Sequence, residues 1–274
     1  MSLSKIHVPQ KRDHGTAFMY PTSIRDLDGI SNPVLNVDFF TMPYPTFPPH
    51  PHAGFSAVTY MLQESEGSFQ NRDSLGDVST IAPGTLHWTF AGSGILHEEI
   101  PTVPGVPCHG LQIFFNTSSK FKTTTPIILH KTLEEQEILQ ENGKQIRNVL
   151  SLPNEIPNKP IITRIDFTEK SEHQHKFGKG RGGMVLNVLG ISYLVDLQLA
   201  VLEKHSSFGF FGEEESNSFI ISGEKGSAIV IIEGDSIPEP IVFGGPFVMN
   251  SQKEIIDAMD RYHRGEMGSL SPSF

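Results

Sequence analysis

The chain has 274 residues, of which 37% are hydrophobic and 19% are charged, a composition that excludes an intrinsically disordered or membrane-spanning protein. Its formal charge of −10 excludes the basic surface on which direct nucleic-acid binding depends. A regulatory role exercised through a protein partner remains compatible with this charge.

The single cysteine and the N-terminal sequence indicate in which cellular compartment the protein is located. Cys108 is the only cysteine, so the chain forms no internal disulfide and suits a reducing environment. The N-terminal residues MSLSKIHVPQKRDHG contain no apolar signal-peptide core, and the sequence has no run of about 18 apolar residues. We therefore predict a cytoplasmic protein that makes no contact with a membrane.

Short apolar or alternating runs, separated by turns that contain Pro, Gly or Ser, fill the stretch from Val34 to Ile113. These runs are VLNVDFF, SAVTYML, STIAP, LHWTF, ILHEEI and GLQIFF. Short strands at regular spacing are typical of a β-sandwich or a β-barrel.

A second series of predicted strands follows after Thr123. EILQ and QIRNVL flank Asn142-Gly143, a pair that suits a two-residue hairpin turn, although a capping-box pattern at Thr132 and Glu135 leaves a helix start open there. The remaining runs are MVLNVL, YLVDLQLAVL, SFIISG, SAIVIIEG and PIVFGG. The sequence thus predicts an all-β chain with two domains, residues 1–125 and 126–274.

One helix is predicted near residues 251–264, at the end of the second domain. Ser251 and Glu254 have the spacing of a capping box, and Gly265 ends the pattern. The apolar positions of its predicted buried face are Ile255, Ile256, Met259 and Tyr262.

Two pairs of polar residues have the spacing of metal ligands. In a strand, residues two apart share a face, so His50 and His52 project together, as do His97 and Glu99, while Glu98 points away. The proline between the first two histidines places that segment on a sheet edge or a bulge. Three imidazoles and a carboxylate would suit a divalent first-row metal and leave open positions for a substrate or dioxygen. From spacing alone, a solvated pair in a Pro-rich loop is an equal alternative.

The other histidines and the cysteine have simpler interpretations. We predict that His173 and His175 lie in an exposed, Gly-rich loop, and that His87 and His109 are packed or hydrogen-bonded residues rather than ligands. Cys108 has no neighbour that would activate a thiolate, so we interpret it as a small buried apolar residue.

Several of these motifs together resemble the pirin family, which belongs to the cupin superfamily. The motifs are HPHAGFSAVTYML, RDSLGDVSTIAPGTLHWTFAGSGILHEE and the later GPFVMNSQKEIIDAM. The resemblance is strong over residues 30–116 and good over 240–265, and it implies a bicupin: an N-terminal metal-binding cupin at 1–125 and a C-terminal cupin without metal at 126–274, made of two cupin-type β-barrels.

The resemblance also implies the ligands. In the common cupin pattern a glutamate follows HxH by four or five residues, but Ser56 and Ala57 occupy those positions here. In pirins the carboxylate comes from the later strand, and the family set maps onto His50, His52, His97 and Glu99. Ala53 stands where many relatives carry a polar residue, which suggests a change at the rim of the site.

The functions known for pirins give two hypotheses. The first is a quercetin 2,3-dioxygenase-like enzyme, in which Fe(II), or Mn, Co, Ni, Cu or Zn, binds a small aromatic or enol substrate that reacts with dioxygen, and Glu99 acts as the catalytic base. The second is an iron-dependent regulatory binding module, like the transcriptional co-regulators of animals, acting through a protein partner. The resemblance implies a monomer in both cases, and the sequence does not identify the substrate-lining residues.

Overall fold

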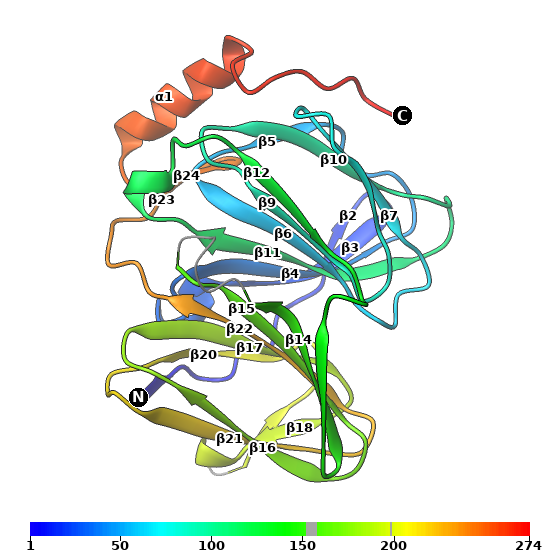
Figure 1. Cartoon of the computed structure of the whole chain (residues 1–274), viewed down its shortest axis with the longest axis vertical. Helices are drawn as coiled ribbons and strands as arrows, with labels where there is room; N and C mark the ends of the chain where they lie inside the picture. The colour runs from blue at the N-terminus through cyan, green and yellow to red at the C-terminus, as the bar shows by residue number, and fades with distance from the viewer. Residues whose placement is uncertain (152–157, 198) are drawn as a thin grey trace. The chain divides into compact units, whose positions relative to one another are not determined.

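The computed structural model describes residues 1–151, 158–197 and 199–274, and Figure 1 shows that their regular secondary structure consists mostly of strands. It divides into two compact units, each assembled from separate segments of the chain. Unit 1 consists of Met1–Gln10, Pro21–Asn36 and Glu134–Ser236, and unit 2 consists of Lys11–Tyr20, Val37–Leu133 and Ile237–Phe274. Among the described residues, no helix is both long and apolar enough to cross a membrane.

This division differs from the predicted domains 1–125 and 126–274. The N-terminal residues belong to the unit formed by most of the second half of the chain, and the C-terminal residues belong to the unit formed by most of the first half. The strand β1 (Ser2–Leu3) pairs with β20 (Ser207–Phe211) inside unit 1. The helix α1 (Gln252–His263) packs against β23 (Val242–Gly244) and β24 (Phe247–Met249) inside unit 2. The predicted helix therefore belongs with the histidine motifs and not with the second series of strands.

Unit 2 contains the strands of the predicted first series. Its larger sheet has the order β12 (Ile127–Lys131), β9 (Leu86–Phe90), β6 (Phe55–Met61), β11 (Cys108–Asn116), β4 (Val34–Met42), β3 (Ala17–Ser23), β2 (Arg12–His14). Its smaller sheet has the order β5 (His50–His52), β10 (Ile95–Pro101), β7 (Phe69–Asp73), β8 (Val78–Ile81). All six predicted runs are confirmed as strands, and β5 is an edge strand, as the proline at its centre requires.

Unit 1 contains most of the second series. Its larger sheet has the order β1, β20, β17 (Arg181–Leu189), β22 (Ala228–Asp235), β15 (Ile161–Phe167), β14 (Lys144–Ser151), β13 (Glu137–Glu141). Its smaller sheet has the order β16 (Ser171–Phe177), β21 (Asn217–Gly223), β18 (Ser192–Leu194), β19 (Ala200–Leu202). Short 3-10 turns lie at Ile24–Leu27, Ser119–Phe121 and Val195–Leu197.

The second series is confirmed with one exception. The predicted hairpin forms around Asn142 and Gly143, whose φ of 75° is one that glycine adopts without strain. The run YLVDLQLAVL does not form one strand, because β18 and β19 are separated by a 3-10 turn and pair with each other. Residue 198 of this run lies outside the described residues. No helix starts at Thr132, which leads directly into the hairpin.

The predicted C-terminal helix is confirmed, but its predicted buried face is only partly right. The side chain of Ser251 accepts a hydrogen bond from the backbone N–H of Glu254, as expected of an N-cap. Ile255 is fully buried together with Ala258, whereas Ile256 remains 51% exposed. Met259 and Tyr262 are also exposed. The buried face of the helix is the one that contacts β23 and β24. The spacing of apolar residues along the helix does not specify this face.

A buried lysine ties the loop after β5 to the C-terminal segment of unit 2. The ammonium group of Lys122 donates hydrogen bonds to the carbonyl oxygens of Gly54 (2.6 Å) and Val248 (3.0 Å) and to Oδ1 of Asn116 (3.0 Å). Three acceptors compensate the burial of the cation, so this contact fixes the chain two residues after His52.

Gly54 leaves no room for a side chain at this junction. Its φ is 81°, and a Cβ atom would lie 2.1 Å from the carbonyl oxygen of Val248. We expect Gly54→Ala to destabilise the protein by more than the roughly 1–2 kcal/mol that the left-handed backbone alone costs a non-glycine residue. Urea denaturation measures this, with Gly76→Ala as the control, since Gly76 has a φ of 92° and open space around it. Equal losses in the two variants would show that the clash is relieved at no cost.

Candidate metal centre

The pairing of β5 with β10 brings the two polar motifs together. In this antiparallel pair His97 lies directly opposite His50, and Ile95 lies opposite His52. Residues opposite each other in a ladder have side chains on the same face, so the three imidazoles converge inside unit 2. Their ring centroids are 4.7 to 4.9 Å apart.

The three histidines form a group that could hold a metal ion. One nitrogen of each of His50, His52 and His97 lies within 4.8 Å of the others. His52 and His97 are buried, and His50 is partly buried. Burial lowers the pKa of His52 to about 3 and that of His97 well below its ordinary value, so both rings are neutral at physiological pH. Neutral imidazole is the form that binds metals.

The hydrogen bond of His50 fixes its tautomer. Its Nδ1 lies 3.0 Å from the carbonyl oxygen of Pro48, and a carbonyl can only accept, so Nδ1 carries the proton. The lone pair of Nε2 then points away from this bond and is free to coordinate. Metal-binding histidines usually have such a partner on the other ring nitrogen, which raises their basicity and orients the ring.

The environment of His97 indicates whether these residues fit a metal. It is 2% exposed, and among the residues that the structure describes neither Nδ1 nor Nε2 has a hydrogen-bond partner. Leaving a buried polar group unpaired costs about 1–3 kcal/mol, and most buried polar groups in folded proteins are paired. A ring held in this way between two other imidazoles fits a metal ligand better than it fits a packing residue.

Glu99 lies in the same interior but is held by a different group. Its side chain is buried, and the hydroxyl of Thr59 lies 2.7 and 2.8 Å from its two oxygens. It is not part of the group formed by the three histidines. Burial raises the pKa of Glu99 to about 7, and the hydrogen bond from Thr59 partly offsets this rise. A carboxyl group of this kind can hold or release a proton at neutral pH.

The raised pKa of Glu99 predicts a pH-dependent stability. The folded protein keeps this carboxyl protonated between its unfolded pKa of 4.5 and about 7, so stability present below pH 4.5 is lost as the pH rises through 7. We expect Glu99→Gln, which removes this titration, to gain about 3 kcal/mol relative to the wild type between pH 4.5 and 8. Urea denaturation of metal-free protein at both pH values measures it. A difference that does not change with pH would contradict the buried, neutral carboxyl.

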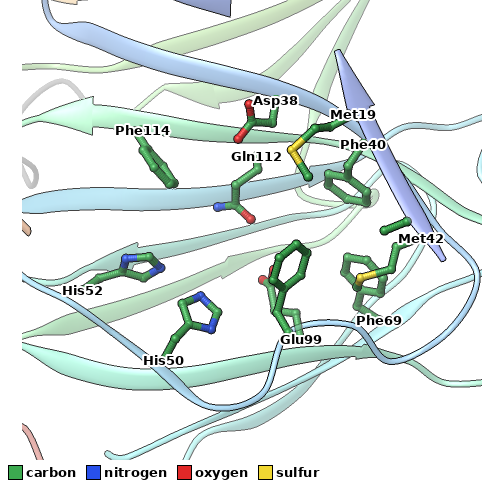
Figure 2. A pocket seen from close by; sticks show the side chains of 12 residues that line it. Met19, Asp38, Phe40, Met42, His50, His52, Phe69, Glu99, Gln112 and Phe114 are labelled. Carbon is green, nitrogen blue, oxygen red and sulfur yellow. The ribbon is translucent and has the colours of Figure 1, made fainter. Parts of the chain in front are cut away.

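A cavity of about 130 Å³ opens beside the histidines, and Figure 2 shows the side chains around it. Most of its wall is apolar and includes aromatic rings and thioethers. The lining residues are Ala17, Met19, Asp38, Phe40, Met42, Phe47, His50, His52, Phe69, Glu99, Gln112 and Phe114. The cavity thus places two of the imidazoles and Glu99 beside a mostly apolar space.

Two neighbours of the predicted ligands lie elsewhere. Glu98 points away from the cavity as predicted, is 0% exposed and forms an ion pair of 2.7 Å with Arg72. Ser273 near the C-terminus also donates hydrogen bonds to Glu98. Ala53 does not lie at the rim of the site, because it is fully buried against Phe247 in a cluster beneath α1.

The prediction for the second histidine pair is wrong. His173 and His175 lie on β16 and not in an exposed loop, and His175 packs against Phe219 and stacks on Phe177. Its Nε2 is 3.5 Å from the carboxylate of Glu233. Within the described part of the chain, this pair does not belong to a group of three or more possible metal ligands.

The interpretations of the other three residues are confirmed. The ring of His109 is 2.9 Å from the hydroxyl of Thr41, and His87 is buried, with its Nδ1 3.4 Å from the hydroxyl of Ser79. Cys108 is fully buried, and burial raises its pKa to about 12, so its thiol is unreactive.

Comparison with known proteins identifies the family. The model of the pirin family matches residues 29–115, and the model of the pirin C-terminal cupin domain matches residues 164–268. The chain belongs to the pirin family. A pirin-like protein from Solanum lycopersicum is 34% identical over 248 residues, which cover 86% of this pirin and 82% of the relative.

Solved structures share the two-cupin fold of this pirin. A quercetin 2,3-dioxygenase from Acinetobacter baumannii matches with a TM-score of 0.84 and 24% identity, covering 99% of this chain and 98% of the other. A bacterial pirin from Escherichia coli, solved in complex with nickel(II), matches with a TM-score of 0.66 and 17% identity, covering 85% of this chain and 100% of the other. At these identities the likeness establishes the fold, which is the predicted all-β bicupin with a short C-terminal helix.

Proposed function

We propose that this pirin is a metal-dependent dioxygenase that acts on a flavonol-like enol and binds its metal through His50, His52, His97 and Glu99. The observation that carries the proposal is the buried imidazole of His97, whose two nitrogens have no hydrogen-bond partner in the described part of the chain. Three nitrogen donors and one oxygen donor suit divalent first-row metals. We infer Fe(II) as the native ion, with Mn, Co, Ni, Cu and Zn as alternatives, and the nickel(II) complex of the bacterial pirin supports a transition metal.

A metal bound at this site would lower the pKa of a hydroxyl group that coordinates it and would make the resulting enolate reactive toward dioxygen. The protein supplies the acceptor for the released proton. Glu99 lines the cavity, and its carboxylate can accept that proton when it is ionised. The enol O–H bond breaks, and its proton moves to an Oε atom of Glu99.

Thr59 supports this role of Glu99. Its hydroxyl donates to the carboxylate and has only one hydrogen to give, so it favours the ionised form that can accept a proton. Thr59 also lies 3.0 Å from the amide oxygen of Gln112, and these two residues are direct partners across β6 and β11. The sheet therefore holds Thr59 beside the base, and its single hydrogen can go either to Glu99 or to the amide oxygen of Gln112.

The cavity wall supports a flat aromatic substrate. Phe114 stands beside His52, with ring centroids 5.8 Å apart, and Phe40 stacks on Phe69 at 5.2 Å. Aromatic and thioether side chains give the cavity a mostly apolar wall against which an aromatic ring could pack. This chemistry fits a flavonol, which presents a hydroxyl and a carbonyl oxygen on adjacent carbons.

Purified protein loaded separately with Fe(II), Mn(II), Co(II), Ni(II) or Cu(II) and mixed with quercetin in air tests the proposal. We expect at least one metal to give oxygen uptake, loss of the visible absorption of quercetin and release of carbon monoxide, with metal-free protein inactive. Stoichiometric metal binding without turnover for any metal would overturn the enzyme and favour the iron-dependent regulatory module, which acts through a protein partner.

A further inference from the structure

We propose that His14 and Phe47 form a stacked pair that covers the mouth of the cavity, so that a flat aromatic ligand reaches His50 only after this pair opens. We call these two residues the gate pair. The inference rests on the proposed function for the class of ligand, and it concerns how that ligand enters and leaves the cavity.

The exposure of the wall indicates where the cavity opens. Half of the lining residues are buried and form its floor, among them His52 and Glu99. The others keep some contact with solvent, which places them toward the mouth: Met19, Asp38, Phe47, His50, Gln112 and Phe114. The rings of Phe47 and His50 are neighbours, with centroids 6.5 Å apart. A ligand that approaches His50 from this side therefore meets Phe47 first.

An exposed side chain covers one face of the Phe47 ring. His14 lies on β2, at the edge of the larger sheet of unit 2, and its ring stacks on Phe47 with a centroid distance of 4.9 Å and an angle of 15° between the rings. Aromatic pairs prefer such offset-stacked arrangements. His14 is not among the lining residues, so it can act on a ligand only through Phe47.

Prolines leave Phe47 with little freedom other than rotation of its side chain. The loop between β4 and β5, residues 43–49, reads PYPTFPP, and the ring of each proline fixes its φ. Pro48 also restricts the backbone of Phe47, the residue before it, to extended conformations. The hydrogen bond between His50 and the carbonyl oxygen of Pro48 anchors the end of this loop. Opening of the mouth then requires a rotamer change of Phe47, which the stacked ring of His14 opposes.

Loss of the stack should change the rates of binding and not the affinity. Because His14 lies outside the cavity, the gate pair can close over an empty or an occupied site. Such a gate multiplies the association and dissociation rate constants by the same factor, and the dissociation constant does not change. The stacking energy of an aromatic pair corresponds to a factor of roughly 2 to 13 in the opening equilibrium. A residue that only shapes the wall would instead change the dissociation rate constant and the affinity together.

Anaerobic stopped-flow binding of 3-hydroxyflavone to nickel(II)-loaded protein measures both rate constants without turnover. The shift in flavonol absorption reports association, and displacement by an excess of a second flavonol reports dissociation. We expect His14→Ala to raise both rate constants by about fivefold and to keep the dissociation constant within about twofold of the wild type. His14→Phe, which keeps an aromatic ring in the stack, should retain the rates of the wild type.

His263→Ala is the matched control, because it removes another exposed histidine that contacts an aromatic ring, Tyr262 on α1. It should leave both rate constants unchanged. Unchanged rate constants in His14→Ala, a rise in the dissociation rate constant alone, or no binding of 3-hydroxyflavone to the wild type would overturn the inference. Oxygen uptake is measured in a separate experiment. Gated binding without oxygenation counts against the proposed function and supports the gate pair, whereas oxygenation with binding rates that His14→Ala does not change supports the function and overturns the gate pair.

Discussion

We expect His97→Leu to make the metal-free protein more stable and to remove the stabilisation that nickel(II) should give to the wild type. In the metal-free protein, the substitution replaces a buried ring with two unpaired nitrogens by an apolar side chain of similar size. We expect a gain of about 1–3 kcal/mol in the free energy of unfolding. With nickel(II) at about 1,000 times the dissociation constant, the wild type should gain roughly 4 kcal/mol and the variant should gain little.

Denaturation with and without nickel(II) measures both effects, and His109→Leu is the matched control. The ring of His109 has a hydrogen-bond partner in Thr41, so its loss should lower the stability of the metal-free protein and leave the gain from nickel(II) intact. If His97→Leu instead behaves like the control, His97 is a packing residue and the site does not hold a metal through it.

On the proposed function, we expect Glu99→Gln to lower the turnover of quercetin by at least about 100-fold and to leave most of the metal bound. General-base catalysis contributes typically 10²–10⁴-fold, and glutamine cannot take the enol proton. The three imidazoles remain, because His50, His52 and His97 form their group without Glu99. Steady-state oxygen uptake and metal analysis of the same sample give the two quantities.

Glu98→Gln is the control for this experiment, because the neighbouring carboxylate faces away from the cavity and pairs with Arg72. Its loss should reduce stability and leave turnover within a few-fold of the wild type. Full activity in Glu99→Gln would show that Glu99 is not the base. Loss of both metal and activity would show that Glu99 acts chiefly as a metal ligand.

The alternation along each strand made part of this site predictable. In HEE, residues 97–99, a period of two separates Glu98 from its neighbours, and the structure places its carboxylate outside the cavity. The proline between His50 and His52 predicted an edge strand, which β5 is. These features depend on local backbone geometry, which a short stretch of sequence specifies.

The second half of the site depends on register between distant strands and could not be predicted. Gln112 and Asp38 line the cavity, and Thr59 lies beside Glu99, only because their three strands β11, β4 and β6 are neighbours in one sheet. Nothing in a single sequence states which strands pair or in which register. The contact between the hydroxyl of Thr59 and Glu99 therefore could not be predicted from the residues around either position.

The sequence around His173 and His175 contains a pattern that indicates the observed strand. In EHQHKF the histidines alternate with Glu172, Gln174 and Lys176, and these three are exposed while the histidines are partly buried. A period of two is typical of a half-buried strand, although the polar composition suggested a loop. The polar composition of this stretch therefore favours a loop, whereas its periodicity indicates the strand that the structure contains.

An anomalous difference map from a crystal grown with nickel(II) tests the central claim most directly. The account predicts one strong peak between the rings of His50, His52 and His97, with the carboxylate of Glu99 close enough to complete the set. No peak at this place, with the three imidazoles turned away from one another, would contradict the metal centre and the function built on it.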